Sequence, residues 1–381
     1  MFEYQKHGRF FAQCARGVEE MLADELRELG ASEAVPGVRG VAFRAGRDEL
    51  GAVVLRSRLA GRVLAPLLTF DCHSDRYLYA TARKLDWDAV LSPERTFAVV
   101  ANVARSRINH SQFAAQRLKD AIVDHFRESC GRRPSVDRHT PDLWLNLHIN
   151  NDRATIALDV SGGSLHRRGY RLESVDAPLQ ETLAAAVLRH SGWSGAGPLV
   201  DFMCGSGTLL AEAWLMASRI PPGWRNADAA SLPAALPDID IATWRRAVDR
   251  ARAEHREPAA GLVSGSDVDG AAVRAARVNL ASLPGGEAVR VVRADFRDVE
   301  VSEGSVIVVN PPYGVRLRER DEVAALYKDL GDHLKRKCRG AEAWVLCGDV
   351  ELVKRVGLRP KRRIPLWNGG LECRLVHYEL Y

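Results

Sequence analysis

The loop Asn310-Pro311-Pro312-Tyr313 carries the sharpest chemical pattern in the sequence, because it directly follows the apolar run 306–309. Each proline fixes φ and lacks a backbone N–H. The loop therefore offers two neighbouring acceptors, the Asn310 side-chain oxygen and the Pro311 carbonyl. Two acceptors suit an –NH₂ group, which has two hydrogens to donate, and Tyr313 can stack on a flat base. We predict that Asn310, Pro311, Pro312 and Tyr313 form a catalytic loop that acts on an exocyclic amine.

Methyl transfer is a reaction that such a loop could support. The lone pair of an exocyclic amine is delocalised into its ring, and acceptors aimed at its hydrogens localise that pair toward a methyl sulfonium. Orientation supplies much of the remaining acceleration, and the proton can leave after attack. The alternative is a surface turn in which the two prolines only stop the strand. We do not expect a cysteine nucleophile, because no cysteine lies within residues 305–320.

A second stretch, residues 198–213, has the pattern of a strand, a glycine-rich turn and a helix. Gly205 and Gly207 allow a ligand close to the backbone because they have no Cβ. The helix N-terminus that follows favours the negative end of a ligand. A G-x-G pattern without a third glycine is weak evidence, and no lysine precedes Thr208 as it would in a P-loop. The turn needs support from other residues.

Acidic residues at the ends of three successive predicted strands provide that support. They are Asp201, Asp267 and Asp295. A carboxylate at the tip of the second strand binds ribose hydroxyls in nucleotide-binding folds. Any one of the three could simply be a helix N-cap, a position that aspartate favours. Three of them beside a glycine turn favour a ligand site, with residues 221–260 as an insertion between the first two.

Four segments together resemble one known family, the THUMP-domain-containing RNA guanine-N2-methyltransferases. The resemblance lies in residues 201–208, 310–314 and 368–375, and in the connector 158–171. It extends over nearly the whole chain. It implies a Rossmann-like class I methyltransferase domain with a mostly parallel, doubly wound sheet, preceded by a ferredoxin-like and THUMP α/β region that binds RNA.

The resemblance also implies S-adenosylmethionine (SAM) as the cofactor, with a role for each matching position. Asp267 would hold the ribose, with Asp269 as a less favoured contact. Asp295 would bind the adenine amine, and Asn310 the target amine. The methionine part of the cofactor would lie between the glycine turn and the helix that precedes the strand leading into that turn. The predicted cofactor contacts are Pro178, Thr182, Asp201, Cys204, Gly205, Ser206, Gly207, Asp267, Asp269, Asp295, Phe296 and Asn310.

The expected reaction is transfer of a methyl group to the N2 amine of a guanosine in structured RNA. We favour 23S rRNA, with tRNA as the second candidate. Two other functions stay open. Asn-Pro-Pro-Tyr also serves adenine-N6 methylation, and the loop alone cannot choose between the two amines. The chain could instead be a catalytically silent RNA-binding or ribosome-assembly factor.

The RNA partner should meet basic residues, and the net charge of +5 permits a polyanionic partner. Phosphate contacts give affinity without sequence choice. Basic clusters lie at 132–138, 166–171, 316–320 and 361–363, and any one of them is more often a solvated face than a binding site. The second and third border the catalytic domain. Our predicted RNA contacts are therefore Arg167, Arg168, Arg171, Arg316 and Arg318.

Hydrophobic periodicity supplies the elements that must hold these residues. We predict a ferredoxin-like part at 1–60, a THUMP-like domain at 61–165 and the methyltransferase domain at 166–381. Strands 143–149 and 155–160 should form a hairpin. The other predicted strands are 10–14, 40–43, 64–72, 199–202, 262–266, 289–294, 305–309, 343–347 and 375–380. The predicted helices are 18–29, 111–130, 178–190, 241–254, 270–283, 322–336 and 349–356.

Several classes of protein are disfavoured by composition. The seven cysteines are odd in number and lack zinc-ligand spacing, so we expect neither a disulfide framework nor a metal site. The N-terminus has no apolar signal region. No apolar run approaches the roughly 18 residues of a membrane span. We expect a cytoplasmic monomer that does not bind membranes.

Overall fold

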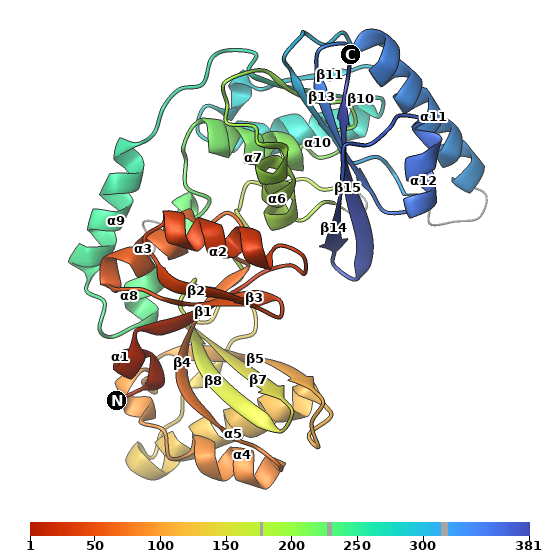
Figure 1. The fold of residues 1–381 in the computed structure, drawn as a ribbon. Coiled ribbons are helices and arrows are strands. Elements are labelled where there is room, and N and C mark those ends of the chain that lie inside the picture. The colour runs from red at the N-terminus through yellow and green to blue at the C-terminus, as the bar shows by residue number, and fades with distance from the viewer. Residues whose placement is uncertain (176–177, 227–230, 314–318) are drawn as a thin grey trace. The chain divides into compact units, whose positions relative to one another are not determined.

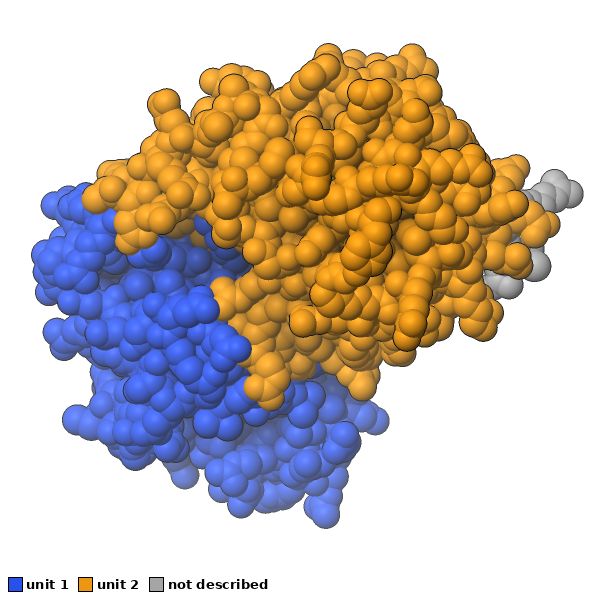
Figure 2. All heavy atoms as spheres, turned by 45° about the horizontal axis from the view of Figure 1, so that its top comes forward, with its two compact units in different colours: residues 1–14, 22–165, 223–250 blue, residues 15–21, 166–222, 251–381 orange. Residues whose placement is uncertain are grey.

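The computed structural model describes residues 1–175, 178–226, 231–313 and 319–381 (Figure 1). Their contacts divide them into two compact units, which Figure 2 shows in different colours. Unit 1 comprises residues 1–14, 22–165 and 223–250, and unit 2 comprises residues 15–21, 166–222 and 251–381. Each unit has its own sheet with helices, which confirms the predicted α/β class. The ranges 1–60, 61–165 and 166–381 remain predictions.

Unit 1 is built on one eight-stranded sheet with the order β2-β3-β1-β4-β8-β7-β5-β6. Strands β1–β3 and strands β5–β8 belong to one sheet because β4 pairs with both β1 and β8. The predicted hairpin is confirmed, since β7 and β8 pair antiparallel. The strands are β1 (Arg9–Gln13), β2 (Ser32–Gly37), β3 (Gly40–Arg44), β4 (Arg62–Asp71), β5 (Thr96–Ala104), β6 (Ser135–Val136), β7 (Leu143–Asn150) and β8 (Arg153–Asp159).

The helices of unit 1 bury one face of this sheet. Along β7, Leu145, Leu147 and Ile149 are buried, and α5 packs on β5 and β7. Helix α5 ends at Gly131, whose φ is +72°, as the sequence predicted. The helices that lie wholly or mostly in unit 1 are α1 (Glu3–His7), α2 (Glu19–Glu28), α3 (Arg47–Arg56), α4 (Asp75–Ala82), η1 (Trp87–Ala89), α5 (Ser111–Cys130), η2 (Trp224–Asn226), α8 (Ser231–Ala235) and α9 (Ile241–Ala253).

Unit 2 has a seven-stranded sheet with the order β11-β10-β9-β12-β13-β15-β14. Five strands run parallel, and the C-terminal pair β14–β15 is antiparallel. This confirms the mostly parallel, doubly wound sheet. The strands are β9 (Leu199–Asp201), β10 (Val263–Asp267), β11 (Arg290–Arg293), β12 (Val306–Val309), β13 (Glu342–Cys347), β14 (Arg362–Asn368) and β15 (Leu371–Glu379).

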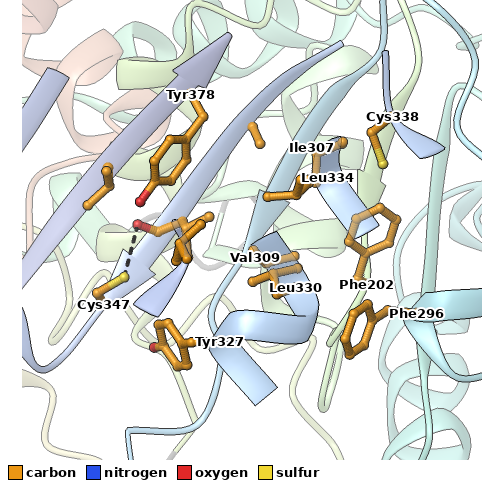
Figure 3. Close-up of a cluster of buried hydrophobic side chains, with 14 of the residues drawn as sticks. Phe202, Phe296, Ile307, Val309, Tyr327, Leu330, Leu334, Cys338, Cys347 and Tyr378 are labelled. Carbon is orange, nitrogen blue, oxygen red and sulfur yellow. Dashed lines mark hydrogen bonds between the residues drawn. The ribbon is translucent and has the colours of Figure 1, made fainter. Parts of the chain in front are cut away.

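Helix α11 forms a continuous core with the sheet of unit 2. Leu330 and Leu334 of this helix lie against Ile307 and Val309 of β12, and Phe202 closes the cluster (Figure 3). This core supports the ends of β9 and β12. The helices are α6 (Glu181–Ser191), α7 (Thr208–Ala217), α10 (Gly270–Ala281), η3 (Gly286–Ala288), η4 (Phe296–Asp298), α11 (Glu319–Lys337) and α12 (Val350–Arg355).

Candidate active site

Strand order brings the two predicted loops to one edge of the sheet. Strand β9 pairs with β10 on one side and with β12 on the other, all parallel. The chain order therefore reverses at β9, and ligands of open α/β sheets bind at the carboxyl ends of strands around such a point. The glycine turn follows β9, and Asn310 follows β12. The structure thus places both loops at the switch point of the sheet.

The glycine turn has a backbone that ordinary residues rarely adopt. Gly205 and Gly207 have φ values of +54° and +83°. Gly207 also lies directly on α10, since a Cβ there would stand 3.1 Å from the Cβ of Ala276. Helix α7 begins at Thr208, so its first N–H groups face the edge where the turn lies. The turn can hold a ligand by backbone atoms alone.

Asp201, at the end of β9, is 1% exposed. Its Oδ1 accepts one hydrogen bond, from the Met203 N–H at 3.1 Å. Loss of water on burial raises the pKa of Asp201 to about 8, and the nearby Asp267 carboxylate adds to that effect. A buried carboxyl of this kind stays protonated near neutral pH until a cation compensates its charge.

Asp267, at the end of β10, holds two loops in place. The Gly205 N–H donates to its Oδ2 at 2.9 Å, and the Asp269 N–H donates to its Oδ1 at 2.9 Å. Each carboxylate oxygen has a further lone pair that a ligand hydroxyl could use. Asp269 itself is exposed and caps α10 by accepting from the Ala271 N–H at 2.9 Å.

Asp295 follows β11 and begins η4. It accepts from the Arg297 N–H at 3.0 Å and pairs with the Arg297 guanidinium at 2.6 Å. The next residue, Phe296, is buried, and its ring lies near those of Phe202 and His333. Asp295 thus stands at the surface of a packed aromatic cluster.

The remaining predicted cofactor residues lie around the turn. Pro178 is exposed, and Thr182 is buried in α6. Cys204 is buried, and burial raises the pKa of its thiol far above the ordinary value, as expected for a packing residue. Ser206 is buried, and its hydroxyl accepts from Arg171 at 3.1 Å.

The catalytic loop holds Tyr313 against its own asparagine. The Tyr313 hydroxyl donates to Asn310 Oδ1. Its ring lies on Gly348, just after β13, where a Cβ would stand 2.5 Å from the ring. Pro311 is buried and Pro312 exposed. In this arrangement the tyrosine ring packs on the protein and orients the Asn310 side chain.

The predicted RNA contacts occupy different environments. Arg167 is exposed. Arg168 is buried and pairs with the buried Glu212 at 3.5 Å, so its guanidinium is not offered at the surface. Arg171 binds Glu181 at 3.0 Å and Ser206, so it braces the glycine turn. Arg316 and Arg318 lie outside the described residues.

Asn279 is a residue of this site that the sequence interpretation missed. It is buried on α10, and its Oδ1 accepts from the N–H groups of Leu172 and Glu173 at 2.7 and 2.9 Å. Its Nδ2 donates to the carbonyls of Glu173 and Ser206 at 2.8 and 2.9 Å. The signal was an asparagine at helical spacing from Ala272, Ala275 and Ala276, on the apolar face of its helix.

Two features are absent from the ranges of residues that the structure describes. No group of three or more His, Cys, Asp or Glu side chains there could hold a metal ion. None of the helices in those ranges is long and apolar enough to cross a membrane.

Comparison with protein families assigns most of the chain. Residues 168–377 match the family described as "RMKL-like, methyltransferase domain". Residues 73–159 match the THUMP domain, and residues 9–64 match the RlmL ferredoxin-like domain.

Individual proteins give the same result. The chain is 43% identical to the ribosomal RNA large subunit methyltransferase K/L of Syntrophotalea carbinolica, over 98% of this chain and 53% of that protein. It therefore spans about half the length of that relative. It is 41% identical to the "Putative RNA methyltransferase slr0064" of Synechocystis, over 98% of this chain and 97% of that one. The structure of SMU.472, described as "a putative methyltransferase complexed with SAH", is 26% identical, with a TM-score of 0.86 over 98% of both chains.

Proposed function

We propose that this chain transfers a methyl group from SAM to RNA. It belongs to the RlmL-like family of THUMP-containing methyltransferases, and the proposal proceeds from that membership. The family match covers more than half of the chain, and relatives share 41–43% of its residues. Membership confirms the resemblance inferred from the motifs. The observation that carries the proposal is the position of Asn310, which follows β12 beside the glycine turn at the switch point of the sheet.

The residues at the switch point fit SAM. The glycine turn and the first N–H groups of α7 can hold a carboxylate. The buried Asp201 accepts from a backbone N–H and its pKa is raised by burial, so a ligand ammonium would compensate its charge. Asp267 keeps lone pairs for ribose hydroxyls. When bound, SAM supplies a methyl group on a sulfonium, and the homologous SMU.472 was solved with SAH.

The chain's own contribution to the reaction is orientation of an amine. Asn310 Oδ1 has two lone pairs, and Tyr313 uses one of them. The other, with the Pro311 carbonyl, can accept the two hydrogens of an –NH₂ group and direct its lone pair outward. Tyr313 acts here as a positioning residue, because its hydroxyl fixes the rotamer of Asn310. After the methyl group has moved, the positively charged amine nitrogen loses one proton to solvent.

We propose guanine N2 in rRNA as the target. Three features support it: the acceptor pair fits an exocyclic amine, the motifs resemble those of guanine-N2 methyltransferases, and the Syntrophotalea relative is named as a large-subunit rRNA methyltransferase. We also predict that the protein is cytoplasmic and monomeric, and that tRNA is the second candidate substrate.

Two experiments test the proposal. Nucleosides from rRNA and tRNA of cells that lack the gene are compared with wild type by mass spectrometry. Loss of N2-methylguanosine from rRNA is the expected result. Loss of N6-methyladenosine would replace guanine by adenine, and no loss would favour a silent RNA-binding factor. In vitro, Asn310→Ala should still bind SAM and lose turnover, whereas wild-type activity of this variant would remove Asn310 from the mechanism.

A further inference from the structure

The eight-stranded sheet of unit 1 has an open face with a groove of about 1090 Å³. The strands that line it come from both the first part and the later part of the sheet, β1, β3, β4, β5, β7 and β8. Residues alternate between the two faces of each strand. Thus Leu147 and Ile149 point to the helices and are buried, while His148 points into the groove and is exposed.

Polar side chains form a row across this face. Asn102 pairs with His148 in register, His148 with Thr155, and Thr155 with Thr69. The two threonine hydroxyls are 3.1 Å apart. Side chains in register on neighbouring strands lie side by side. The row offers donors and acceptors at intervals of about 4.8 Å, the spacing of strands.

Two flat rings stand on the same face. Phe11 of β1 is half-buried, and its ring lies across Gly40 of β3, where a Cβ would stand 2.4 Å from the ring. The other ring is that of His148, whose side chain is exposed on this face, although partial loss of water within the groove lowers its pKa below the ordinary value. Its imidazole is therefore neutral at neutral pH and presents an uncharged face. Base stacking on rings of this kind does not depend on sequence.

The charge of the groove is positive. Among the described residues that line it, four are arginines and one is a carboxylate, Glu3. Glu3 is already engaged by the N–H and hydroxyl of Thr69, at 2.8 and 2.9 Å. Arg105 and Arg153 are exposed. Arg153 begins β8, and Arg105 directly follows β5. Both strands contribute a residue to the polar row.

We propose that this groove, defined by Phe11, His148, Arg105 and Arg153, binds a single-stranded segment of the RNA substrate. The inference rests on the proposed function, which makes RNA the substrate. Phe11 and His148 lie three strands apart, about 14 Å across the sheet, and are offset by about 13 Å along the strands, because Phe11 is in register with Trp144 through Leu64 and Asp159. Their separation is therefore about 20 Å. An extended single strand can place bases on both rings, with its phosphates near the arginines. Base-paired RNA keeps its bases stacked inside the duplex, away from such rings.

The test uses the full chain, without cofactor, and a labelled 12-nucleotide single-stranded RNA followed by fluorescence anisotropy. Arg105→Gln with Arg153→Gln should weaken binding about tenfold and reduce the slope of log affinity against log salt by about 1.4, two phosphate contacts on a single strand. His148→Ala should weaken binding about tenfold with an unchanged slope, because stacking releases no ions. Phe11→Leu, which keeps apolar volume, should do the same.

Arg133→Gln with Arg138→Gln is the matched control, since both arginines are exposed in unit 1 and neither lines the groove. This control should bind within twofold of wild type. Equal losses in the control and groove pairs, or no loss in the groove pair and in His148→Ala, would overturn the proposal. So would a duplex of the same sequence that binds as tightly as the single strand. SAM affinity, measured separately, should be unchanged in every variant, and an inability of the wild type to bind SAM would contradict the methyltransferase function without altering the RNA result.

Discussion

Replacement of Asp201 by asparagine should change how the stability of unit 2 depends on pH. The wild-type carboxyl is 1% exposed, and burial raises its pKa to about 8. In the unfolded chain an aspartate has a pKa of about 3.9 and is ionised above pH 5. Between these values the folded protein holds one proton that the unfolded chain has lost. The free energy of unfolding therefore falls as pH rises, and stabilisation by the buried neutral acid is lost on approaching pH 8.

One proton corresponds to about 1.4 kcal/mol per pH unit. From pH 5.5 to pH 7.5 the free energy of unfolding of the wild type should therefore fall by at most about 3 kcal/mol because of this group. Asparagine carries no charge at any pH, and its Oδ1 can still accept from the Met203 N–H. Asp201→Asn should thus gain up to about 3 kcal/mol relative to wild type over that range.

The assay is denaturant unfolding of both proteins at pH 5.5, 6.5 and 7.5, followed by a probe in unit 2. Asp269→Asn makes the same substitution at an exposed carboxyl of the same sheet edge and serves as the control. A difference between wild type and Asp201→Asn that stays constant across the three pH values would refute the reasoning from burial.

Binding of SAM gives a second readout of Asp201. If a cationic group of the cofactor compensates the carboxylate, binding at pH 7 should release close to one proton. Calorimetry in two buffers of different ionisation enthalpy measures that number. The proton release should disappear in Asp201→Asn. Release that persists in the variant would assign the proton to another group.

Three further changes test neighbouring residues. Asn279→Ala removes four hydrogen bonds and leaves the buried Ser206 carbonyl without this donor, so unfolding free energy should fall by about 2–4 kcal/mol, measured by denaturant unfolding; a loss under 1 kcal/mol would contradict its bracing role. Gly348→Ala must displace the Tyr313 ring, so kcat should fall while the Kd for SAM, measured by calorimetry, stays unchanged. Asp295→Ala should weaken SAM binding and also lower stability by about 1 kcal/mol, whereas Asp295→Asn should weaken binding alone; an unchanged Kd in both would remove Asp295 from the cofactor site.

Local sequence patterns were enough to predict the framework of the site. The segment from β9 to α7 contains a strand, a turn and a helix within 20 residues. Asn310 follows β12, whose apolar residues predict a strand without any knowledge of the strands that pair with it. Parallel strands follow from the alternation with helices, and parallel strands place their carboxyl ends at one edge. The position of both loops was therefore accessible from the sequence.

Long-range pairing was not accessible. Arg168 and Arg171 were expected to face RNA because basic residues cluster in the connector. Their partners Glu212 and Glu181 lie 44 and 10 residues further along the chain, and nothing local marks them as partners. Strand β14 was missed for a local reason, since its partner β15 begins three residues after it ends. Two exposed arginines and Pro365 interrupt the apolar alternation by which a strand is recognised. Residues 15–21 group with unit 2 and 223–250 with unit 1 through contacts that no periodicity reveals.

The three acidic residues show that a structural role and a ligand role need not compete. Asp267 and Asp295 both accept backbone N–H groups, as ordinary caps do. Those bonds fix each carboxylate at the end of its strand before any ligand arrives, and a group held in place in advance binds at lower entropic cost. Alanine removes both the cap and the charge, so it cannot separate the two roles. Asparagine keeps an acceptor and removes only the charge, and the comparison of the two variants is what distinguishes a cofactor contact from a cap.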